Sequence, residues 1–164
     1  MKSGTLHLAE RHPAPINRQL LAIGIGSIAA IAANVVYYLL ASELLDIPMV
    51  APSEDPLKKL SPLPVTDVII FSLVFSIGAS IIFLVTANFS PRPAQVYVGL
   101  CVVVLILSLF MPLMIPTPPV PMATKFVLAS MHVLGAAVLV PILIALGLPP
   151  KKERSAILSE GRIM

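Results

Sequence analysis

Charged residues are scarce in this chain of 164 residues. Asp, Glu, Lys and Arg together make up 12% of it, about half of the roughly 25% that is usual in soluble domains. Hydrophobic residues make up 57%, and the mean hydropathy is +0.97. A soluble domain of this size has too much surface for its volume to bury so many apolar side chains. The composition therefore predicts a membrane protein whose apolar surface faces lipid.

Cysteine is almost absent too. The single residue, Cys101, excludes an internal disulfide and a metal site built from several thiolates. It lies in an apolar run, where we expect a small packing residue.

The net charge of +3 is small and dispersed, so we expect no nucleic-acid partner. Paired intramembrane carboxylates, a nucleophile with its base and a glycine-rich phosphate loop are also missing. We therefore expect a protein that is not an enzyme and that requires no metal or cofactor.

Four long intervals without charged residues divide the chain. Each exceeds the ~20 apolar residues that cross ~30 Å of hydrocarbon, and each should be helical because its backbone groups must bond within the segment. We predict an all-α fold, an integral membrane four-helix transmembrane bundle over residues 19–147. Of the 17 prolines, only Pro141 lies clearly inside a span, where it should kink the helix. The expected helices span about 19–42, 66–88, 95–115 and 124–147, with an outer loop at 43–65 and tails at 1–18 and 148–164.

The distribution of Lys and Arg predicts the orientation. One side has eight of them, in the two tails and the second loop: Lys2, Arg11, Arg18, Arg92, Lys151, Lys152, Arg154 and Arg162. The other side has three: Lys58, Lys59 and Lys125. The positive-inside rule then places both termini in the cytoplasm, with the chain in the bacterial inner (plasma) membrane. The basic tail at 148–164 can contact a partner or the anionic inner leaflet.

Small residues predict which helix faces point inward. Helices in lipid pack closely where small side chains let their backbones approach. The first helix has Gly26 and Ala30 at four-residue spacing, and the fourth has Gly135 and Ala136 close to His132. We predict that these four residues pack against neighbouring helices.

Polar residues at similar depth predict a layer in the outer half of the membrane. Asn34 and His132 each lie seven residues, or ~10 Å, from the outer end of their helices. Ser72 and Ser76 bracket the same depth, and Ser108 lies slightly nearer the surface. All four helices can thus supply one polar group to a single layer, which either holds the helices together or binds a ligand.

Several roles remain open for His132, since an intramembrane ionisable residue is a functional candidate by default. We favour a structural hydrogen bond to Asn34 or a serine. The alternatives are contact with a quinone, a lipid or a pigment, and a proton relay with Asp67. A further alternative is a copper site with thioether ligands, drawn from Met111, Met114, Met122 and Met131.

Two stretches carry a resemblance to a known family: "AANVVYYLLA" in the first span and "MHVLGAAVLVP" in the fourth. The chain resembles an uncharacterised bacterial family of small four-helix integral membrane proteins, a domain of unknown function of actinobacterial and chloroflexi type, over about residues 18–147. The resemblance implies the same fold and brings no activity or cofactor.

These observations lead to one expected function and two alternatives. We expect a non-enzymatic accessory or structural subunit that contacts membrane lipids and packs against other integral membrane proteins in a larger complex. The first alternative is a binder or carrier of a small lipophilic ligand at the layer around His132. A transporter is the less favoured second alternative, because the sequence shows no internal repeat.

Overall fold

The computed structural model describes residues 15–53, 60–115 and 120–149. Four helices in it are long and apolar enough to cross a membrane, which confirms the prediction of four apolar helices. The elements in chain order are α1 (Ile16–Leu39), the π-helical turn η1 (Leu40–Leu44), β1 (Val50–Pro52), β2 (Leu60–Pro62), α2 (Val65–Phe89), α3 (Pro93–Leu113) and α4 (Met122–Gly147). Most of the terminal tails predicted at 1–18 and 148–164, including Lys151, Lys152 and Arg154, lies outside the described residues.

A proline stands at the start of each of the four long helices. Pro15, Pro64 and Pro121 immediately precede α1, α2 and α4, and Pro93 is the first residue of α3. At the first helical position, that of Pro93, the fixed φ of proline matches the helix and its missing N–H has no partner to lose. The other three prolines are N-cap residues with a non-helical ψ. The expectation that only Pro141 lies inside a helix is wrong. Pro112 lies within the last turn of α3, where it cannot donate the helical hydrogen bond to the carbonyl of residue 108 and the helix ends one residue later.

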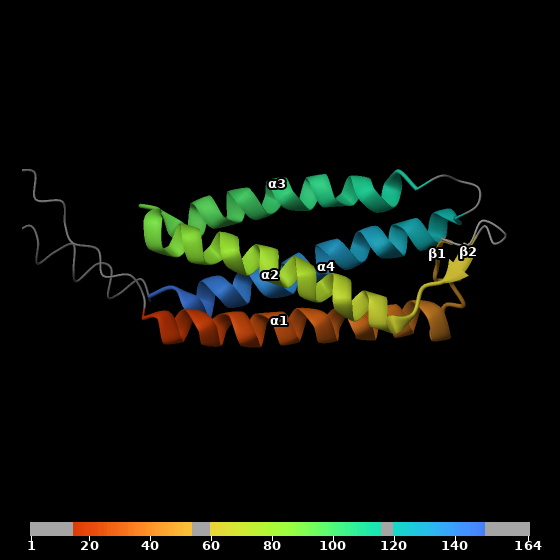
Figure 1. The fold of residues 1–164 in the computed structure, drawn as a ribbon, viewed down its shortest axis with the longest axis horizontal. Helices are drawn as coiled ribbons and strands as arrows, with labels where there is room; N and C mark the ends of the chain where they lie inside the picture. The colour runs from red at the N-terminus through yellow and green to blue at the C-terminus, as the bar shows by residue number, and fades with distance from the viewer. Residues whose placement is uncertain (1–14, 54–59, 116–119, 150–164) are drawn as a thin grey trace, which may run out of the picture.

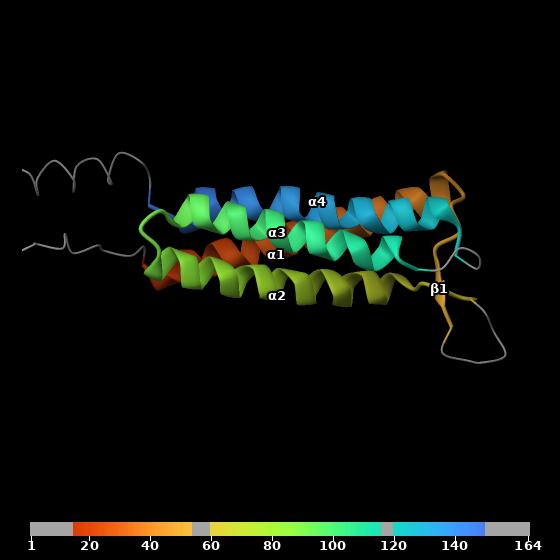
Figure 2. The ribbon, with the colours of Figure 1, turned by 90° about the horizontal axis from the view of Figure 1, so that it is seen from above.

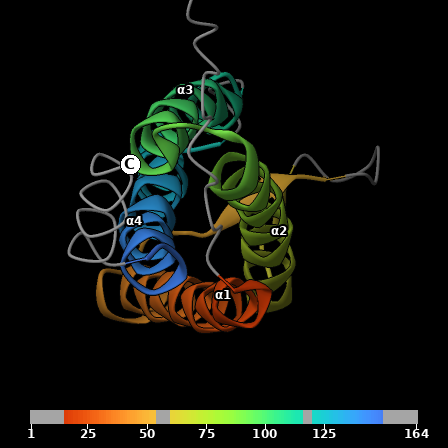
Figure 3. The same ribbon diagram turned by 90° about the vertical axis from the view of Figure 1, so that its left-hand side faces the viewer.

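The four helices form a bundle in which each packs against its neighbours in the order α1, α2, α3, α4. Viewed end-on, down its long axis, the bundle has its four helices arranged in a ring (Figure 3). The most extensive contact is between α1 and α4. From the turn at residues 90–92, α2 and α3 diverge toward the end that carries the strands (Figure 1), and all four helices run along the same direction (Figure 2).

The buried apolar residues form two clusters at different levels of the bundle. The first includes Phe83, Tyr97 and Leu143, together with Ala22, Ala30, Leu139 and Leu148. The second lies toward the strands and includes Ala41, Met49, Leu63, Val68, Val127 and Met131. Asn34 and Ser72 are buried on α1 and α2 between residues of these two clusters.

A small cap covers the end of the bundle near the second cluster. Strands β1 and β2 pair antiparallel, with Ala51 opposite Ser61. The Tyr38 hydroxyl donates to the Leu63 carbonyl at 2.6 Å, and Thr124 Oγ1 donates to the Pro48 carbonyl at 2.6 Å. The segment expected as a loop at 43–65 therefore contains a π-helical turn and a hairpin, held to α1 and α4 by these bonds.

Candidate functional site: polar groups between the helices

A hydrogen bond joins α1 to α2 inside the bundle. Asn34 Nδ2 donates to Ser72 Oγ at 3.0 Å, and these two residues are only 7% and 8% exposed. The other amide atom, Asn34 Oδ1, is fully buried and has no hydrogen-bond partner in the described part of the chain. Two of the predicted layer residues are thus brought together, with one acceptor left over.

Gly135 allows α4 to approach this pair. A Cβ atom at Gly135 would lie 3.2 Å from Asn34 Nδ2, which is tighter than an ordinary contact. Gly26 has the same role on α1, since its Cβ would lie 2.9 Å from Leu139 Cδ1. Of the other two predicted packing residues, Ala30 is buried in the first cluster and Ala136 is half-buried.

His132 stands apart from the Asn34–Ser72 pair. Its Nδ1 lies 2.8 Å from the Leu128 carbonyl, one turn earlier in α4. The ring meets Phe75 of α2 edge to face, with centroids 4.9 Å apart and planes at 79°. No hydrogen bond joins it to Asn34, because the α4 residue that faces the Asn34 amide is Gly135. In place of the favoured structural bond to Asn34 or a serine, the ring bonds a backbone carbonyl of its own helix.

The remaining serines of the predicted layer differ in their surroundings. Ser76 is buried one turn after Ser72, and its backbone carbonyl accepts a hydrogen bond from Ser80 Oγ at 2.6 Å. Ser108 is half-buried, and its hydroxyl donates to the Leu105 carbonyl of its own helix at 2.8 Å. Ser108 therefore adds no hydrogen bond between α3 and the other helices.

Three polar contacts of α1 were missed by the sequence reasoning. Tyr37 OH lies 2.8 Å from Ser130 Oγ of α4. Near the opposite end of the bundle, Arg18 Nε donates to the Leu146 carbonyl at 2.6 Å, and Asn88 Nδ2 donates to Gln19 Oε1 at 3.3 Å. Tyr37 follows Asn34 by three residues, and helical spacing places two such residues on one face. That spacing was the available signal.

Tyr97 and Gly147 also have roles that the sequence did not indicate. Tyr97 is fully buried on α3 and meets Phe83 edge to face at 5.4 Å, while its hydroxyl lies beside the Cys101 thiol one turn later on the same helix. Gly147 lies against Phe83 so closely that an added Cβ would be 2.8 Å from Phe83 Cε1. The last turn of α4 can reach α2 only because residue 147 has no side chain.

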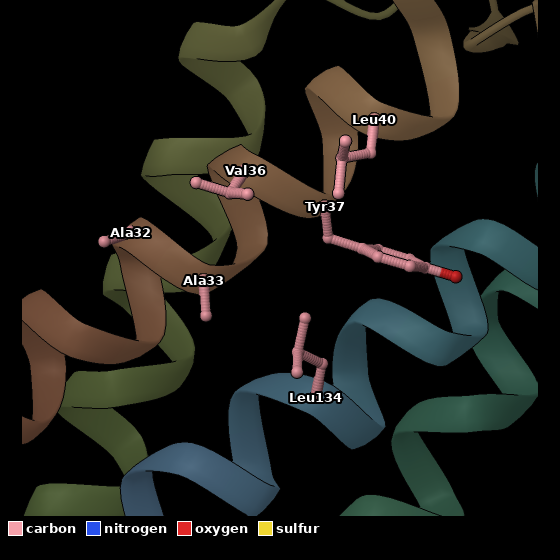
Figure 4. Close-up of a pocket in the computed structure, with 6 residues that line it drawn as sticks. All are labelled: Ala32, Ala33, Val36, Tyr37, Leu40 and Leu134. Carbon is pink, nitrogen blue, oxygen red and sulfur yellow. The ribbon is translucent and has the colours of Figure 1, made fainter. Parts of the chain in front are cut away.

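A shallow groove of about 400 Å³ lies between α1 and α4. Tyr37 and Leu134 reach across it (Figure 4), and its other lining residues are Ala32, Ala33, Val36 and Leu40. The only polar side-chain atom among them, the Tyr37 hydroxyl, is paired with Ser130. Because ligand sites orient their ligands through a few polar groups, this groove suits a hydrocarbon surface better than a polar ligand.

Metal ligands do not gather in the part of the chain that the structure describes. No group of three or more His, Cys, Asp or Glu residues there is placed to hold a metal ion. The four methionines of the copper alternative differ in their surroundings. Met131 is buried in the second cluster, whereas the other three are exposed: Met111, Met114 and Met122.

Comparison with known proteins identifies the family. No curated protein and no solved structure matches the chain. A protein-family model described as a family of unknown function, DUF6069, matches residues 14–146, close to the predicted extent of about 18–147. The predicted membership of an uncharacterised family is thereby confirmed. Because the match covers most of the sequence, the chain belongs to this family of unknown function.

Proposed function

We propose that the protein is a non-enzymatic accessory or structural subunit that packs against other integral membrane proteins. The observation that carries this proposal is the outward face of α1. Gly24 is exposed there, and an added Cβ would meet no atom within 4 Å. A glycine in a helix costs about 1 kcal/mol relative to alanine and offers lipid almost no contact. Outward glycine does allow a second helix to approach closely.

The groove continues the same face of α1. Ala32, which lines it, follows Gly24 by eight residues, and Ile28 lies between them. Positions four residues apart lie on one side of a helix. Gly24 and Ala32 are therefore two small residues on one side of α1, with the exposed Ile28 side chain between them, and a partner helix can pack against this side and the groove.

Substitution of Gly24 tests this surface. The tagged chain is purified in mild detergent from its native membranes, and co-purifying proteins are quantified by mass spectrometry. Gly24→Leu should reduce partner recovery at least fivefold without lowering the thermal midpoint of the isolated chain. Gly78→Leu is the matched control, because Gly78 on α2 is also exposed and open but lies on a helix that does not line the groove. A wild-type chain that purifies as a stable monomer without partners would contradict the proposal.

The proposed setting is the bacterial inner membrane, with both termini in the cytoplasm and lipid around the bundle. The larger number of Lys and Arg residues in the tails and the second loop supports this orientation. The strand cap then faces outward. The actinobacterial and chloroflexi type of the family belongs to the same proposal.

A second candidate function is binding or carriage of a small lipophilic ligand. The observation that favours it is the half-buried His132 ring, whose Nε2 bonds no group in the described part of the chain. Saturable binding of a lipophilic probe by the purified chain in lipid nanodiscs tests this function. Uptake that rises linearly with probe concentration, as in empty nanodiscs, would refute it.

A further inference from the structure

The hydrogen bond of His132 determines which ring nitrogen carries its proton. A backbone carbonyl oxygen can only accept a hydrogen bond. The 2.8 Å contact between Nδ1 and the Leu128 carbonyl therefore requires a proton on Nδ1. In the uncharged ring, Nε2 is then unprotonated and presents a lone pair to any donor that reaches it.

The ring can be approached from the side of the bundle. His132 is half-buried, and Phe75, against which it packs, is 42% exposed. The Phe75 contact places the ring where α2 meets α4. Toward the cap α2 and α3 separate (Figure 1), and the Phe75 side chain is exposed beside the histidine ring.

Depth restricts the kind of donor. His132 lies seven residues after Lys125 on α4, which places it ~10 Å further into the span at 1.5 Å per residue. Phospholipid headgroups stay outside the hydrocarbon region. A hydroxyl that reaches Nε2 must therefore belong to a molecule whose polar group enters hydrocarbon. The exposed edge of Phe75 adds an aromatic surface that favours an aromatic ring beside it.

We propose that His132 and Phe75 bind a lipophilic phenol of the quinol class, in which the phenolic O–H donates to Nε2 and the aromatic ring packs on Phe75. The proposal rests on the second candidate function, ligand binding, and names its ligand class. The Nδ1 bond to Leu128 fixes the ring so that Nε2 remains the acceptor.

Titration of the full chain in phosphatidylcholine nanodiscs tests the proposal. The probes are decylubiquinol and, as a control without a phenolic donor, decylubiquinone. Binding is measured by isothermal titration calorimetry, and the ring nitrogens are followed by ¹⁵N NMR of histidine-labelled protein. Decylubiquinol should bind saturably and shift the His132 Nε2 resonance, whereas decylubiquinone should bind about tenfold more weakly.

Two histidine variants separate the acceptor from the fold. His132→Asn retains a donor near the Nδ1 position and removes the Nε2 acceptor, so decylubiquinol should bind about tenfold more weakly, the change that corresponds to ~1.4 kcal/mol. His132→Gln places an amide near the Nε2 position and should restore most of the affinity. Phe75→Leu should weaken binding, whereas Phe71→Leu, which alters an exposed phenylalanine one turn away on α2, should not.

Each contrary result has a distinct meaning. Equal binding of both probes that is unaffected by His132→Asn would overturn the quinol site and leave ligand binding in place. Absence of saturable binding by either probe would overturn both. An Nε2 resonance that shifts only when a co-purifying membrane protein is present would overturn the quinol site and support the subunit function.

Discussion

The buried Asn34–Ser72 bond leads to a prediction in which the smaller substitution is the more harmful. Ser72→Ala removes the acceptor of Asn34 Nδ2, so both amide atoms of a side chain that is 7% exposed lose or lack a partner. An unsatisfied buried donor costs about 1–3 kcal/mol, and hydrogen bonds in a membrane bundle contribute at most about 1.7 kcal/mol. We expect Ser72→Ala to lower the free energy of unfolding by about 1–2 kcal/mol.

Asn34→Leu should cost less, although it changes the larger residue. Leucine branches at Cγ as asparagine does, so it fills nearly the same space beside Gly135 and removes the unpartnered Oδ1 along with the donor. The Ser72 hydroxyl, which loses its partner, can turn to the carbonyl one turn earlier in α2, as the Ser80 hydroxyl does with Ser76. We therefore expect a change within about 1 kcal/mol of zero. Ser72→Ala should add little in the Asn34→Leu background, because the bond is already absent.

Equilibrium unfolding in mixed micelles, with increasing sodium dodecyl sulfate and detection by circular dichroism, measures all three variants. A cost above about 2 kcal/mol for Asn34→Leu, together with a cost below about 0.5 kcal/mol for Ser72→Ala, would refute this account of the bond. That result would mean that Asn34 contributes through Oδ1 rather than through its bond to Ser72.

Three further predictions concern packing, topology and the cap. Gly147→Ala should destabilise the protein by about 1–3 kcal/mol, because the added methyl group overlaps Phe83. Gly78→Ala, whose methyl group meets nothing within 4 Å, should stabilise it by up to about 1 kcal/mol. Unfolding in mixed micelles compares the two variants, and equal effects would contradict the packing of Gly147 against Phe83. In a Cys101→Ser background, a membrane-impermeant maleimide added to intact cells should label Ser53→Cys and not Ser90→Cys, and the reverse pattern would invert the proposed orientation. Tyr38→Phe removes the hydroxyl bonded to Leu63 and should lower the free energy of opening the cap by about 0.5–1.5 kcal/mol, seen as faster hydrogen exchange at the Leu63 amide. As a control, Tyr37→Phe removes a hydroxyl whose partner is Ser130 and should leave that exchange unchanged.

The sequence predicts helix placement well because one large free-energy cost decides it, the cost of placing charged residues in hydrocarbon. Charged residues cannot remain in the hydrocarbon region cheaply, so the intervals between them fix where helices can lie. That cost does not determine which side chains form hydrogen bonds with one another. His132 has a carbonyl one turn earlier on its own helix, and that local acceptor replaced the expected bond to Asn34. The depth of Asn34 and Ser72 was sufficient to place them at one level, where they do bond.

The cap and Gly147 depend on contacts that no local pattern records. The two strands have three residues each and both end in proline, which is a poor strand signal. Their pairing is supported by Tyr38 and Thr124, which lie on two different transmembrane helices. Likewise, Gly147 matters only because Phe83 of α2 reaches it, so its importance depends on tertiary packing.

The two proposed functions use different sides of α4 and can therefore be separated. Leu134 lines the groove with α1, whereas His132 meets Phe75 of α2. Two residues along a helix correspond to a rotation of about 200°, so these side chains leave α4 in nearly opposite directions. Side-chain hydrogen bonds join α1 to α2 and to α4: Asn34–Ser72, Tyr37–Ser130, Arg18–Leu146 and Gln19–Asn88. A partner that packs on α1 thus contacts a helix that hydrogen bonds hold to α2 and α4. Gly24→Leu should therefore reduce partner recovery without changing quinol affinity, and His132→Asn should do the reverse.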